Sequence, residues 1–76
     1  MGYNGSMEKG NKFAERLKEI RKEWNISQME LSKATGLSQS AIAKWERGKT
    51  EPTASALIAL AEFFNESVDF LLGLRE

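Results

Sequence analysis

The sequence contains no cysteine and no histidine among its 76 residues. Without cysteine, neither a disulfide nor a thiolate metal site can stabilise the fold, and the redox compartment is left open. Without histidine, imidazole acid–base catalysis and the commonest metal ligand are excluded. The carboxylates form no pair in an evident cleft. We therefore expect a protein that is not an enzyme and that holds no metal and no cofactor.

Long apolar runs are also missing. No run approaches the roughly 20 apolar residues of a membrane-spanning helix, and the start of the chain lacks the charged and then apolar pattern of a secretion signal. We expect a cytoplasmic protein with no membrane partner, and no small-molecule ligand is evident. A chain this short forms one domain with a small core, because folding at this size buries only about 60% of its surface.

Charge of one sign does not dominate the whole chain, in which 11 basic residues balance 11 acidic ones. The two halves nevertheless differ. Up to residue 50 there are ten Lys or Arg against six Glu, a net charge of +4, and the remainder has one Arg against five Asp or Glu, a net charge of −4. Such asymmetry indicates nucleic-acid contact, with the basic half facing the phosphates. The alternative is chance combined with a solvated acidic end.

Residues 1–11 have three Gly, two Asn and no apolar periodicity. We expect them to be a disordered arm or a remnant of cloning, with Met7 as the natural start. The domain should then occupy residues 12–74. A helix is predicted over about 12–24, because four apolar residues recur there at helical spacing: Phe13, Leu17, Ile20 and Trp24.

Capping residues predict four further helices. Residues 27–30 form a capping box that begins a helix over 28–35, which Gly36 ends because glycine reaches positive φ without strain. Ser38 caps a helix over about 39–47. The last two predicted helices are a nearly all-apolar one over about 54–64 behind Thr53, which must be covered on more than one side, and one behind Ser67 in which Val68, Leu71 and Leu72 close the core. The expected fold is all-α, with five helices, and the second and third form a helix-turn-helix.

The helix over 39–47 has two unlike faces. At about 100° per residue, Ala41, Ile42 and Trp45 fall on one side. The other side carries no acidic residue, and Glu46 falls at its far edge. An ordinary amphipathic surface helix is the alternative, although a solvated face usually mixes both signs. We predict that this polar side reads bases in the major groove through Ser38, Gln39, Ser40, Ala43 and Lys44.

Phosphate contacts are predicted on both sides of this helix. Gln28 lies in a first helical turn, where free N–H groups and the helix dipole attract phosphate. The other predicted phosphate contacts follow the reading helix: Arg47, Lys49, Thr50 and Thr53.

At these residues the chain resembles the phage-repressor and Cro-like (XRE-type) family of helix-turn-helix DNA-binding proteins. The resemblance runs from about Phe13 to Gly73 and rests on matched motif positions: Gln28, small Ser32, Gly36, branched Ile42 and the run Trp45-Glu46-Arg47-Gly48. Two residues depart from the family pattern, since Ser32 stands where Ala is usual and Thr35 where an aliphatic residue is usual.

The resemblance implies a compact repressor-like domain, and it supports the phosphate contact of Gln28. It also implies that Arg21 and Glu46 form a structural salt bridge between the first helix and the reading helix. Finally, it implies a two-fold homodimer joined through the fifth-helix region. Apolar residues in excess of what a small core hides agree with such an interface, which would comprise Phe63, Val68, Phe70, Leu71 and Leu74.

We therefore predict a sequence-specific regulator of transcription, of the Cro/C1 type, that binds double-stranded DNA and reads an inverted repeat as a dimer. Repression by occluding polymerase is the first expectation for its effect. The alternative is a protein-interaction module, such as an antitoxin or a co-regulator, that uses the same fold and binds its partner through the apolar fourth and fifth helices.

Overall fold

The computed structural model describes residues 12–75, and the expectations for residues 1–11 lie outside this part of the chain. Five α-helices follow one another within it: α2 (Phe13–Glu23), α3 (Gln28–Thr35), α4 (Gln39–Glu46), α5 (Ala54–Phe64) and α6 (Val68–Leu71). No strand occurs among the described residues, so the predicted all-α fold is confirmed. None of these helices has the length and apolar content needed to cross a bilayer.

Local capping decides where the helices begin. Ser27, Ser38, Thr53 and Ser67 each precede a helix, and each side-chain oxygen accepts a hydrogen bond from the backbone N–H three residues further on. The Glu30 carboxylate accepts from the backbone N–H of Ser27 at 2.8 Å, which completes the predicted capping box. Because each cap is worth about 1 kcal/mol, these residues fix the start of four short helices.

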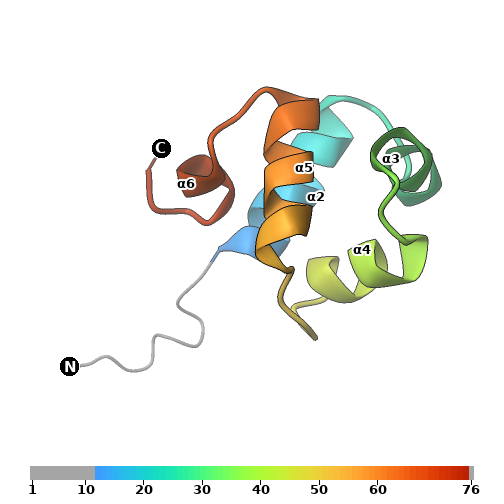
Figure 1. Ribbon diagram of the computed structural model, residues 1–76, viewed down its shortest axis with the longest axis horizontal. Coiled ribbons are helices and arrows are strands. Elements are labelled where there is room, and N and C mark those ends of the chain that lie inside the picture. Colours follow the sequence, from blue (N-terminus) through green and yellow to red (C-terminus); the bar gives the residue numbers. More distant parts are fainter. Residues whose placement is uncertain (1–11, 76) are drawn as a thin grey trace.

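The core takes one fully buried side chain from every helix. α2 packs against α4 and α6, and α3 packs against α4 and α5. In Figure 1, α5 stands in front of α2, with α6 on one side and the pair α3 and α4 on the other. The fully buried side chains, in chain order, are Leu17, Leu31, Ile42, Leu60 and Leu71. Truncating one of them to Ala should cost about 2–5 kcal/mol.

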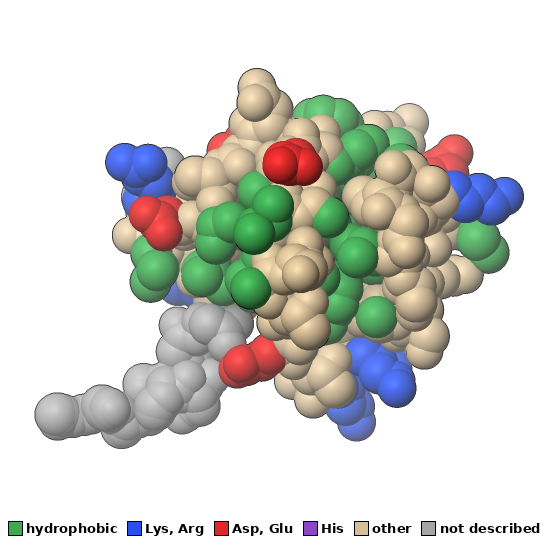
Figure 2. Space-filling view, viewed as in Figure 1, with side chains coloured by type: hydrophobic (Ala, Val, Ile, Leu, Met, Phe, Trp, Pro, Cys, Tyr) green, Lys and Arg blue, Asp and Glu red, His purple; other side chains and the backbone are tan. Residues whose placement is uncertain are grey.

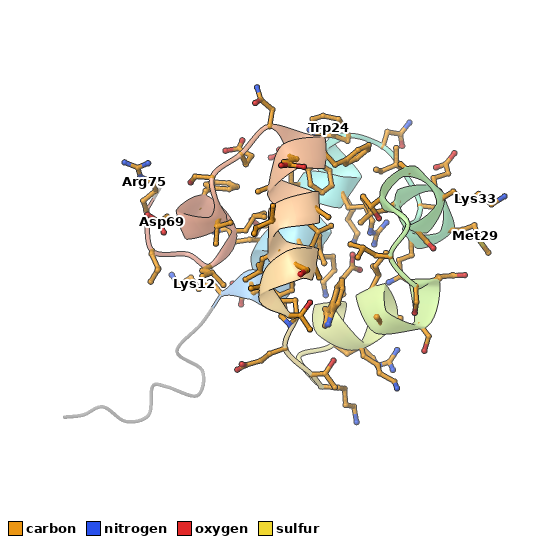
Figure 3. All side chains as sticks on the ribbon, in the orientation of Figure 1. Lys12, Trp24, Met29, Lys33, Asp69 and Arg75 are labelled. Carbon is orange, nitrogen blue, oxygen red and sulfur yellow. The ribbon has the colours of Figure 1, made fainter. Side chains whose placement is uncertain are left out.

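Two apolar residues are more exposed than the sequence pattern predicted. Trp24, the last member of the predicted stripe on α2, is 46% exposed. Its ring packs against Phe64 at 5.1 Å and Phe63 at 5.4 Å between centroids, at one end of α2 and α5 (Figure 3). On α5, Ile58 is 52% exposed. The helix is covered on more than one side, as expected, since it packs against both α3 and α6, but the side that carries Ile58 faces outward in the protomer.

Candidate nucleic-acid interface

α4 meets the rest of the protein with one face. Ile42 is fully buried, and Trp45 is 7% exposed and lies edge-on to Phe13, with ring centroids 6.1 Å apart. These contacts hold the helix from behind. In Figure 1, α4 lies at the lower margin of the molecule. Anchoring through one face leaves the opposite face of α4 turned outward.

The residues predicted to read bases lie on that outward face. Ser38, Gln39, Ser40 and Lys44 are exposed, and Ala43 is partly exposed. The hydroxyl oxygen of Ser38 accepts from the backbone N–H of Ala41 at 2.9 Å, which leaves the hydroxyl hydrogen available to a ligand. We call these five positions, 38–40, 43 and 44, the α4 outer face. No part of residues 12–75 covers it.

The turn before α4 is short and fixed. Gly36 ends α3 with φ at +80°, a left-handed conformation in which a residue with a Cβ is strained. Leu37 follows and packs against the core. Ser38 then begins α4. A three-residue connection of this kind holds the two helices of the helix-turn-helix in contact.

The predicted partners Arg21 and Glu46 lie in contact. Nε of Arg21 donates to Oε2 of Glu46 at 2.6 Å, and Nη2 donates to Oε1 at 2.9 Å. Nη1 donates to the backbone carbonyl of Ile26 at 2.9 Å. The Glu46 side chain is 4% exposed and that of Arg21 is 13% exposed. This bidentate ion pair connects α2 to the last residue of α4 and so helps to hold α4 on the core.

The charges of the pair are strongly retained. Burial by itself raises the pKa of Glu46, but hydrogen bonds from Arg21 and Gln28 and the charges of Arg21 and Lys18 outweigh it, so the pKa lies below its ordinary value. The hydrogen bond to Glu46 raises the pKa of Arg21, against the smaller effect of burial. Both groups are therefore ionised near neutral pH.

The predicted phosphate contacts lie in two places. Gln28 is in the first turn of α3 and is partly buried, and its Nε2 donates to Oε1 of Glu46 at 3.0 Å. One N–H of this carboxamide thus points at the protein, and the second is left for another acceptor. The other four residues follow the α4 outer face and are exposed: Arg47, Lys49, Thr50 and Thr53.

Exposed charge along residues 38–50 has one sign. The single carboxylate of this segment, Glu46, is buried and neutralised by Arg21. The remaining charges, on Lys44, Arg47 and Lys49, are all positive and exposed. Figure 2 shows Lys and Arg side chains gathered at the lower edge, where α4 and the loop after it lie. The helical wheel puts Glu46 at the edge of the polar side, and the fold buries it, so that only positive charges are exposed along residues 38–50.

The five residues predicted to form a dimer interface are not equivalent. Leu71 is fully buried in the protomer core, so its assignment to the interface is wrong. Phe63 packs on Trp24 and Phe64, and the Phe70 ring lies 4.6 Å from the Arg16 guanidinium carbon. Phe63, Phe70 and Val68 are partly exposed, and Leu74 is 72% exposed.

Ile58 is exposed and apolar but is not among the residues predicted for an interface. Its signal was present in the sequence, because α5 is apolar nearly all round and a domain this small cannot cover every side of it.

Among residues 12–75, no group of three or more acidic side chains is placed to hold a metal ion. The described residues thus present two distinct surfaces, one with exposed positive charges at α4 and one apolar on α5 and after α6.

Comparison with known proteins gives consistent matches. A family model described as helix-turn-helix matches residues 17–71. The chain is 43% identical over 60 residues to repressor protein C2 of Salmonella phage P22, covering 79% of this chain and 28% of that protein. It is 36% identical over 64 residues to the HTH-type transcriptional activator BcrR of Enterococcus faecalis, covering 84% and 31%.

A solved structure also matches. The chain superposes on the P22 c2 repressor in complex with a synthetic operator with a TM-score of 0.75 and 42% identity, covering 79% of this chain and 91% of that one. The chain spans about three tenths of the length of the two curated relatives. The family match over residues 17–71 includes α4 and its outer face.

Proposed function

We propose, from the premise that this chain belongs to the helix-turn-helix family of XRE-type transcription regulators, that it binds double-stranded DNA sequence-specifically and represses transcription. The observation that carries the proposal is the α4 outer face, exposed and free of carboxylates while Ile42 and Trp45 anchor the helix from behind. The resemblance to a repressor solved on its operator supports it. The proposed place of action is the cytoplasm, on DNA.

Base reading follows from the chemistry of the α4 outer face. The Gln39 carboxamide matches the donor and acceptor on the major-groove edge of adenine, and Lys44 suits the two acceptors of guanine. The Ala43 methyl can contact the methyl group of thymine, and the hydroxyls of Ser38 and Ser40 serve either as donor or acceptor. These contacts supply the preference for one sequence over another.

Phosphate contacts orient the helix in the groove without specifying sequence. We assign them to Gln28 and to four exposed residues between α4 and the first turn of α5: Arg47, Lys49, Thr50 and Thr53. If a dimer neutralises about eight phosphates, the logarithm of the binding constant should fall with the logarithm of salt concentration with a slope near −7. A flat dependence on salt would contradict the electrostatic part of the proposal.

We also propose that two copies bind together. The outward apolar residues at α5, at α6 and after it support a homodimer: Ile58, Phe63, Val68, Phe70 and Leu74. A two-fold pair would place its recognition helices about 34 Å apart and thus read an inverted repeat. The acidic residues that follow Thr53 then face away from the phosphates.

Selection of bound duplexes from a random pool tests the proposal. We expect an enriched inverted repeat for the wild-type protein, and loss of preference at particular positions for Gln39→Ala. Arg75→Ala is the control, because Arg75 lies past α6, on the far side of the molecule from α4 (Figure 3). If no duplex is enriched and none is retarded in a gel, the DNA-binding proposal fails and the protein-interaction alternative takes its place.

A further inference from the structure

The two residues that depart from the family pattern, Ser32 and Thr35, both use their hydroxyls in the turn before α4. The Ser32 hydroxyl donates to the backbone carbonyl of Leu37. The Thr35 hydroxyl donates to the carbonyl of Leu31 at 2.8 Å, and its oxygen accepts from the backbone N–H of Leu37 at 3.2 Å. Both backbone polar groups of Leu37 are thus bonded to side chains at the end of α3.

Leu37 is the residue through which α3 is connected to the reading helix. It stands between Gly36, which ends α3, and Ser38, which caps α4. Its side chain packs against the core, while its backbone lies outside both helices. Without the two hydroxyls, its N–H and carbonyl would have to find water or distort the turn. The hydroxyls therefore determine where the peptide that enters α4 is held.

We propose that Ser32 and Thr35 are positioning residues for base reading: by fixing the backbone of Leu37 they fix the angle at which α4 is presented to DNA. This inference rests on the proposed function. Base contacts require side chains to meet base edges at hydrogen-bonding distance and angle, whereas phosphate attraction tolerates displacement. Loss of the hydroxyls should therefore weaken discrimination between sequences more than it weakens DNA binding as such.

The pattern of the neighbouring contacts favours this role over general stabilisation. Ser32 and Thr35 are partly buried, and neither is among the residues of the buried core. The resemblance drawn from the sequence indicates that Ala and aliphatic residues are compatible with the fold at these positions. Variants without the hydroxyls should consequently fold, which makes their effect on binding measurable.

The experiment compares Ser32→Ala, Thr35→Val and Thr35→Ser with the wild type on two duplexes at one salt concentration, the selected operator and an unrelated sequence. Removal of a hydrogen bond of this kind changes an equilibrium by up to about tenfold. We expect Ser32→Ala and Thr35→Val each to lower the ratio of specific to nonspecific affinity about three- to tenfold, with nonspecific affinity within about twofold. Thr35→Ser, which keeps the hydroxyl, should retain the wild-type ratio.

Amide hydrogen exchange of Leu37 in the free protein gives a readout that needs no DNA. Thr35→Val should accelerate this exchange relative to core amides, and Thr35→Ser should not. An unchanged affinity ratio, an unchanged Leu37 exchange rate, or a parallel fall of specific and nonspecific affinity would each overturn the proposal. If the wild type prefers no duplex, the proposed function is contradicted, and the positioning role is contradicted with it. If the wild type and the variants discriminate between duplexes equally well, only the positioning role is contradicted.

Discussion

The outward faces of α4 and α5 are built from opposite materials. The α4 outer face is polar and carries no carboxylate, and the exposed charges of residues 38–50 are all positive, because the one carboxylate of this segment, Glu46, is buried against Arg21. The outward face of α5 presents the apolar Ile58. This helix belongs to the acidic half of the chain, which has one basic residue after residue 50. The first face suits a polyanion, and the second suits an apolar partner that tolerates negative charge. A short chain thus presents two kinds of surface on different helices.

The buried ion pair between Arg21 and Glu46 holds α4, and with it the α4 outer face, on the core. The largest loss of stability is therefore expected when that pair is broken. Glu46→Ala leaves the Arg21 guanidinium without its carboxylate and should cost about 3–5 kcal/mol of unfolding free energy, measured by urea denaturation. Glu62→Ala, which removes an exposed carboxylate from α5, is the matched control and should change stability by less than about 0.5 kcal/mol. Equal losses in the two variants would mean that the pair does not anchor α4.

A smaller effect is expected for a residue of the α4 outer face itself. Lys44→Ala removes an exposed amine and should leave folding stability nearly unchanged. Discrimination at one base position should fall by about 1–3 kcal/mol, because a good contact to a base edge is worth that much. Competition binding against operators altered one base pair at a time measures this. Arg75→Ala should keep every preference, and a uniform loss over all positions in Lys44→Ala would assign Lys44 to phosphate instead.

The ion pair also predicts how stability changes with pH. Because the pKa of Glu46 in the folded protein lies below the ordinary value of 4.5, the folded state holds the carboxylate ionised more strongly than the unfolded state does. This contribution is fully present above about pH 4.5 and is lost as the pH falls through the folded pKa. Urea titrations between pH 7 and pH 3 should show a smaller loss for Glu46→Gln than for the wild type. Parallel curves would contradict it.

The helices were predictable from the sequence because their signals are local. Caps such as Ser27 and Thr53, the turn at Gly36 and the spacing of apolar residues are read within one helix, and the four helices predicted with both ends lie within one residue of the observed bounds. The exposed residues of the α4 outer face follow from the same periodicity, once Ile42 and Trp45 are placed inside.

Contacts between helices were predictable only in part. The wheel left Glu46 at the edge of a polar side, and its pairing with Arg21 came from the resemblance alone. The bond from Gln28 to Glu46 depends on the crossing of α3 and α4, which no single-helix pattern describes. Leu71 and Ile58 were misjudged for one reason: both are apolar residues of the acidic half, and only packing decides which is fully buried and which is 52% exposed.

Ile58 is the residue at which the difference between the two faces is tested most finely. Ile58→Gln introduces a residue that favours helix and removes apolar surface that the protomer does not bury. The free energy of unfolding, measured at a concentration at which the protein is monomeric, should therefore change by less than about 0.5 kcal/mol. Self-association, measured by sedimentation, should weaken nonetheless, because burying that side chain against a second copy contributes only in the dimer. Leu60→Ala, two residues further along the same helix and fully buried, should instead destabilise the protomer by about 2–5 kcal/mol. If Ile58→Gln lowers stability as much as Leu60→Ala and leaves association unchanged, α5 has no outward function and only the α4 face contacts a partner.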